Sequence, residues 1–68
     1  MGAYLFDYLI QCGTSGNDSF RLSRTDSYTG AKVKAMTWKK QFPNEDVTLK
    51  KCDMKNGKQV IVSVETIN

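Results

Sequence analysis

Two stretches in the last third of the 68-residue chain, VTLKKCDM (Val47–Met54) and QVIVSVETI (Gln59–Ile67), decide the fold. Between them stands Lys55-Asn56-Gly57-Lys58, and Asn-Gly is the pair that a two-residue type I′ turn prefers. Both stretches are rich in residues that favour β-strands. They are therefore predicted to form a β-hairpin.

The turn also predicts which residues of the hairpin lie opposite each other: Leu49 and Val64, Lys51 and Val62, Cys52 and Ile61. Because side chains alternate between the two faces of a strand, the expected core face carries Val47, Leu49, Val60, Val62 and Val64. The opposite face is mixed, as expected for a sheet surface turned to solvent, and carries Thr48, Lys50, Cys52, Ile61, Ser63 and Glu65.

A helix is predicted from about Tyr28 to Phe42. Asp26 or Ser27 can cap its first turn, and Pro43 ends it because proline disfavours helical geometry at the residue before it. Apolar residues recur three and four positions apart and so share one helical face: Tyr28, Ala31, Ala35, Trp38 and Phe42. The two alanines on this face allow close approach to a sheet.

The first third of the chain predicts a second pair of strands. Ala3–Cys12 is a run of strand-forming residues that ends at Gly13, and Phe20–Arg24 alternates apolar and polar side chains. The residues between them are typical of a turn. The whole chain, residues 1–68, is therefore predicted to be one small α+β domain of order β-β-α-β-β. Its four-stranded, mainly antiparallel sheet should carry one helix on one face.

The composition excludes several kinds of catalytic and metal site. The chain has no histidine, which removes Ser-His-Asp and Cys-His catalysis and histidine-ligated zinc. Its two cysteines, Cys12 and Cys52, cannot supply a four-cysteine zinc site. The seven carboxylates fall in no catalytic motif. We therefore expect a protein that is not an enzyme and that needs no cofactor or metal.

The chain also lacks the features of a secreted or membrane protein. No apolar run approaches the roughly 20 residues that a membrane helix needs. Met1–Ile10 lacks the basic segment and the cleavage site of a signal peptide. Two cysteines without a signal peptide are typical of reduced, intracellular proteins. The expected location is the cytoplasm, with no membrane partner.

The first strand is apolar on both faces, although one helix can cover only one side of the sheet. Tyr4, Phe6, Tyr8, Ile10 and Cys12 share one face, and Leu5, Asp7 and Leu9 share the other. One explanation is a central strand whose second face is shielded by loop residues. The alternative is an open face that binds a partner, since exposed apolar patches mark interfaces. On this alternative the chain forms a homo-oligomer through the open face or the edge of the first strand, and the interface residues are Tyr4, Phe6, Tyr8, Ile10 and Ile61.

Ten Lys and Arg against seven Asp and Glu give a formal net charge of +3. The basic residues near the last hairpin form a candidate site for an anionic ligand or nucleic acid: Arg21, Arg24, Lys50, Lys51, Lys55 and Lys58. The simpler interpretation, which the low net charge favours, is that these side chains keep a sheet edge and a turn from aggregating.

Two functional hypotheses follow. The first is a non-enzymatic, self-associating interaction protein that binds or inhibits another macromolecule or sequesters a ligand. Small proteins of this kind are common in phages and mobile elements. The alternative is a small basic nucleic-acid-binding module in which Tyr4, Phe6 and Tyr8 stack on bases while the lysine-rich hairpin contacts phosphates.

Overall fold

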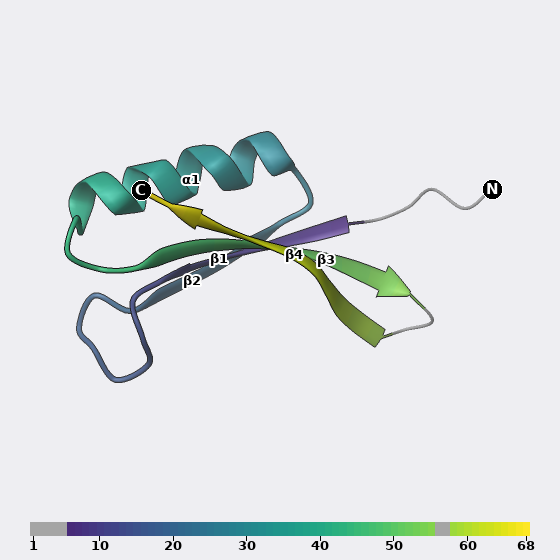
Figure 1. Cartoon of the computed structure of the whole chain (residues 1–68), viewed down its shortest axis with the longest axis horizontal. Coiled ribbons are helices and arrows are strands. Elements are labelled where there is room, and N and C mark those ends of the chain that lie inside the picture. The colour runs from purple at the N-terminus through teal and green to yellow at the C-terminus, as the bar shows by residue number, and fades with distance from the viewer. Residues whose placement is uncertain (1–5, 56–57) are drawn as a thin grey trace.

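The predicted elements and their order are confirmed. The computed structural model describes residues 6–55 and 58–68, so the first five residues and the Asn56-Gly57 turn lie outside the described part. The elements are β1 (Phe6–Cys12), β2 (Arg21–Thr25), α1 (Tyr28–Gln41), β3 (Val47–Lys55) and β4 (Lys58–Ile67). All four strands form one antiparallel sheet, and α1 packs on one of its faces (Figure 1). The chain has the expected α+β architecture.

The strand order β2-β1-β3-β4 places β1 and β3 inside the sheet and β2 and β4 at its edges. β1 pairs with β2 from Tyr8↔Thr25 to Cys12↔Arg21, and with β3 from Phe6↔Asp53 to Cys12↔Val47. Both edges of β1 are therefore occupied. Along Tyr8–Cys12, where β2 and β3 both pair with β1, the predicted association through the edge of the first strand therefore has no free edge.

The helix begins and ends where the sequence predicts. The Gly30 N–H donates to the Ser27 side-chain oxygen at 3.1 Å, which caps the first turn. The last helical residue is Gln41, and Pro43 follows the C-cap. On the predicted apolar face, Ala31 and Ala35 are fully buried, so the helix backbone lies close to the sheet.

The core lies between α1 and the face of the sheet that we call the helix face. Its buried residues are Tyr8, Ile10, Cys12, Ala31, Ala35, Val47, Leu49 and Ile67, with Phe6, Trp38 and Phe42 packed at its margin. Val47 and Leu49 are thus confirmed as core residues. The assignment of Val60, Val62 and Val64 to the core is wrong, because each of these side chains is more than half exposed.

A β-bulge in the last hairpin explains the positions of Val62 and Val64, whereas Val60 precedes the bulge and lies opposite Asp53 on the helix face. Next to the turn the pairing is as predicted, with Cys52 opposite Ile61. Between Lys51 and Cys52 the register shifts, and Lys51 pairs with Ser63 instead of Val62. One extra residue in β4 reverses the alternation of every later side chain. Val64 therefore shares the side of Lys50, opposite α1, which we call the far face.

Candidate functional site

Among the described residues, four of the eight large apolar side chains that are exposed lie on β4. The side chains of Val60, Ile61, Val62 and Val64 are each 53–56% exposed, and we call these four residues the apolar edge. In the part of the chain that the structure describes, β4 pairs with β3 alone. Its outer edge therefore presents backbone N–H and C=O groups beside four half-exposed apolar side chains.

The apolar edge is a band along the strand and is not confined to one face of the sheet. Ile61 lies opposite Cys52 and Val64 opposite Lys50, so both belong to the far face. Val60 lies opposite Asp53 on the helix face. This end of the hairpin extends away from α1 (Figure 1), which leaves Val60 uncovered. Exposed apolar groups therefore lie on both sides of one edge.

The two ends of β4 carry opposite charges. Lys58 begins the strand and is exposed. Near the other end, Glu65 forms an ion pair with Lys32 of α1, and the Tyr28 hydroxyl donates to Glu65 at 3.0 Å. The hydrogen bonds from Lys32 and Tyr28 hold the pKa of Glu65 below its ordinary value. The bond to Glu65 also raises the pKa of Lys32 and that of Tyr28. Glu65 is therefore ionised at neutral pH.

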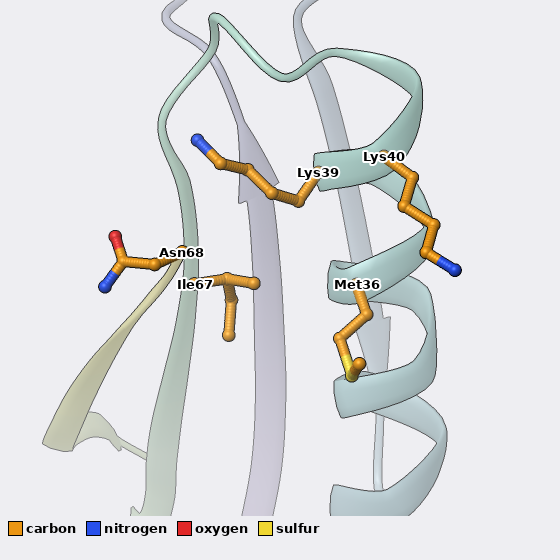
Figure 2. A pocket seen from close by; sticks show the side chains of 5 residues that line it. All are labelled: Met36, Lys39, Lys40, Ile67 and Asn68. Atoms are coloured by element: carbon orange, nitrogen blue, oxygen red, sulfur yellow. The ribbon is translucent and has the colours of Figure 1, made fainter.

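A small pocket lies where the C-terminal end of β4 approaches α1 (Figure 2). It has a volume of about 140 Å³ and is lined by Met36, Lys39, Lys40, Ile67 and Asn68. Pockets for drug-sized ligands start at about 300 Å³. Lys39 is already engaged, because its Nζ donates to the Glu45 carbonyl at 2.9 Å, and Lys40 points away from β4. The pocket is therefore smaller than a site for a drug-sized ligand.

The structure places the predicted interface residues in different environments. Tyr8 and Ile10 lie in the core under α1, and Phe6 packs at the core margin, so none of the three lies on an open face. The prediction that these three residues lie on an open face is wrong, because α1 covers the face of the sheet to which they belong. Ile61 is exposed on the apolar edge, and Tyr4 lies outside the described residues.

The predicted anion-binding residues do not form one patch. Arg24 forms an ion pair with Asp7 at 2.8 Å on the far face, where Lys50 also lies. On the helix face, the Arg21 guanidinium lies 5.1 Å from the centre of the Phe42 ring, and the Lys51 Nζ lies 4.2 Å from that of Phe6. Adjacent residues of a strand point to opposite faces, which separates Lys50 from Lys51. Lys58 is exposed on β4, and the side chain of Lys55 lies outside the described part.

The two thiols are free, buried and separate. Cys12 belongs to the core on the helix face, whereas Cys52 lies on the far face beside Asp7 and Ile61. Burial raises the pKa of the Cys12 thiol, which makes it a poor nucleophile. Across residues 6–55 and 58–68, no three Cys, Asp or Glu side chains gather where they could hold a metal ion. No helix in the same residues is long and apolar enough to cross a membrane.

The sequence predicts Ile61 as an interface residue but misses the three valines of the apolar edge, because its pattern assigns them to the core. A signal was nevertheless present, since three consecutive apolar residues, Val60 to Val62, cannot all face one side of a regular strand. Comparison with known proteins adds no guide to function: no family model matches the chain, and no curated protein or solved structure is detectably similar to it.

Proposed function

We propose that this chain is a non-enzymatic interaction protein that binds another polypeptide by strand addition at the apolar edge of β4. The observation that supports it is the coincidence of four half-exposed apolar side chains with the outer edge of a ten-residue edge strand. Edge strands of soluble proteins are normally short, charged or covered, because an exposed apolar edge pairs readily with another chain. Along Val60–Val64, β4 carries no charged side chain and is not covered in the described part of the chain, and the bulge at Val62 interrupts its regular backbone edge.

Strand addition suits both the backbone and the side chains of this edge. A bound strand accepts and donates main-chain hydrogen bonds along β4, while alternate side chains of the ligand cover the exposed apolar groups. Burying each half-exposed valine or isoleucine contributes roughly 1 kcal/mol. A binding mode of this kind serves an inhibitor as well as an assembly protein, since it needs only a polypeptide in extended conformation.

The alternative nucleic-acid function has weaker support. Sheet aromatics that stack on bases must be exposed, but Tyr8 is buried under α1 and Phe6 is covered in part by Lys51. The basic residues expected to bind phosphates are distributed over both faces of the sheet.

Binding of a labelled peptide tests the proposal. The probe is a peptide as long as β4, made of alternating threonine and valine, followed by fluorescence anisotropy as the protein is titrated. We expect saturable binding that Val62→Lys abolishes, because a charge at the centre of the apolar edge is costly to bury.

Leu22→Lys is the matched control, because Leu22 is a 60% exposed apolar residue on the other edge strand, β2. This variant should bind the peptide as the unmodified chain does. Absence of binding by the unmodified chain, or equal loss of binding in the two variants, contradicts the proposal.

A further inference from the structure

We propose that the polypeptide bound at the apolar edge is a second copy of this chain. In this dimer the two β4 strands pair antiparallel about a two-fold axis, which joins two four-stranded sheets into one. The inference rests on the proposed function and adds to it the identity of the partner and the pairing register. Two-fold dimers of identical chains are the commonest form of assembly, and they require a surface that is complementary to itself.

The bulge in β4 identifies the position of the axis. A bulge sets two residues of one strand against one residue of a regular partner. An axis between Ile61 and Val62 places Val62, the extra residue of each copy, opposite Ile61 of the other copy, so the residues on both sides of the two bulges remain paired. The resulting pairs are Lys58 with Glu65, Gln59 with Val64, and Val60 with Ser63. The register of β3 and β4 puts both members of each pair on the same face of the sheet, as antiparallel pairing requires.

The charges of β4 match in this arrangement. Lys58 of each copy lies directly opposite Glu65 of the other, so the dimer contains the same pair of opposite charges twice. Opposite charges that face each other across a strand pair stabilise it, whereas like charges destabilise it. Lys32 and Tyr28 already keep Glu65 ionised and on the helix face. Ile61 and Val62 of both copies meet at the axis.

The helix leaves this edge accessible. α1 lies mainly over β1 and β3, and Val60, Val62 and Val64 each keep more than half of their surface exposed. A stable interface buries about 800 Å² on each partner, about a sixth of the 4844 Å² surface of this chain. One strand edge supplies less than that area. We therefore expect a reversible dimer whose population depends on protein concentration.

Charge reversal with mixing tests the partner and the register together. The variants are Lys58→Glu, Glu65→Lys and an equimolar mixture of the two, and sedimentation velocity measures dimerisation. Each variant alone faces two like-charge pairs, so its dimer should weaken about tenfold. In the mixture, each variant meets the complementary charge of the other, and the heterodimer should recover the affinity of the unmodified chain.

Recovery on mixing separates a cross-strand pair from a structural defect. Glu65→Lys also removes the contacts to Lys32 and Tyr28, so its thermal unfolding is measured in parallel, but a fold defect would not be repaired by adding Lys58→Glu. The unmodified chain should form a dimer. Val62→Lys is the negative control and should stay monomeric, whereas Leu22→Lys is the positive control and should dimerise like the unmodified chain.

Two results overturn the inference: a chain that stays monomeric at all concentrations, or a dimer that is insensitive to Val62→Lys and gives no recovery in the mixture. The peptide experiment described above then decides separately whether the apolar edge binds strands at all. A monomer that binds the threonine-valine peptide contradicts the dimer and retains the proposed function, whereas a monomer that binds no peptide contradicts both.

Discussion

Glu65 connects the helix to the edge of the sheet through its contacts with Lys32 and Tyr28. Because all three side chains titrate, the stability that these contacts contribute depends on pH. The folded pKa of Glu65 is lowered, so its contribution to stability is complete above the unfolded value of about 4.3 and is lost as the pH falls through the folded pKa. The pKa values of Lys32 and Tyr28 are raised. Their contributions are complete below about 10 and are lost as the pH rises through the folded values.

We expect Glu65→Gln to lower the denaturation midpoint at pH 7 and to have no effect under acidic conditions in which Glu65 is protonated in both states. The glutamine still accepts a hydrogen bond from Tyr28 but loses the charge that attracts Lys32. The measurement is urea unfolding of both proteins across acidic to neutral pH. Because the pair is exposed to solvent, added salt should reduce the difference at pH 7. A difference that stays constant from acidic to neutral pH would contradict this role of Glu65.

The two cysteines should be unreactive in the folded protein. Both side chains are fully buried, and thiol reagents require an accessible thiolate. We expect negligible labelling by a colorimetric thiol reagent in native buffer and labelling of both residues in denaturant. The two residues lie on opposite faces of the sheet and far apart along it, so an intramolecular disulfide should not form on oxidation of the folded chain. Rapid labelling of either thiol in native buffer would contradict the fold.

At the scale of elements, the sequence predicts the strands and the helix better than it predicts which side chains are buried. The apolar spacing, Ser27 and Pro43 correctly give the bounds of α1, because each acts through local geometry. The turn sequence correctly gives the pairing of Cys52 with Ile61. It cannot give the bulge beyond this pair, after which Glu65 and Ile67 lie on the helix face. The candidate site therefore appears only in the structure.

Gly30 offers a direct measurement of helix propensity in this fold. A Cβ at this position would meet ordinary contacts with Ser27 at 3.6 Å. Gly30→Ala should therefore stabilise the protein by about 0.5–1 kcal/mol, since alanine loses less backbone entropy on helix formation. Thermal or chemical unfolding checks the value.

Gly13 is the matched contrast, because its φ is +72° and a Cβ would lie 3.0 Å from a carboxylate oxygen of Glu45. We expect Gly13→Ala to destabilise the protein by about 1 kcal/mol. If the two substitutions changed the free energy of unfolding equally, the backbone conformation of the two glycines would not be the cause of either change.

The whole molecule is thin for its length. Its principal extents are 42 × 23 × 15 Å, and its radius of gyration is 12.6 Å, against about 11 Å for a compact domain of this size. One helix covers one face of four strands, and the end of the last hairpin extends past it (Figure 1). The core is correspondingly small, and exposed apolar side chains remain on β2 and β4. The length of the chain indicates such a shortage of buried surface, but only the strand order shows where the uncovered groups lie.

A small core makes the stability of the whole chain depend on few residues. Ile10 is fully buried at its centre, and Ile10→Ala should cost about 2–5 kcal/mol, a large part of the stability of a small domain. Leu22→Ala, at an exposed position, should change stability by less than about 0.5 kcal/mol. Urea unfolding of the two variants checks both values. A small effect of Ile10→Ala would contradict its place in the core.

The central position of β1 also determines when the sheet can be completed during synthesis. β1 pairs with β3 from Phe6↔Asp53 to Cys12↔Val47, so one of its two neighbours is translated about 35–47 residues later. At a translation rate of about 5–20 residues per second, β3, which helps to bury Tyr8 and Ile10, is synthesised roughly 2–9 s after these residues. The β1–β2 and β3–β4 hairpins are local, whereas the β1–β3 pairing must close a long loop. We therefore expect the joining of the two hairpins, with α1 docking over them, to be the late step of folding on the ribosome.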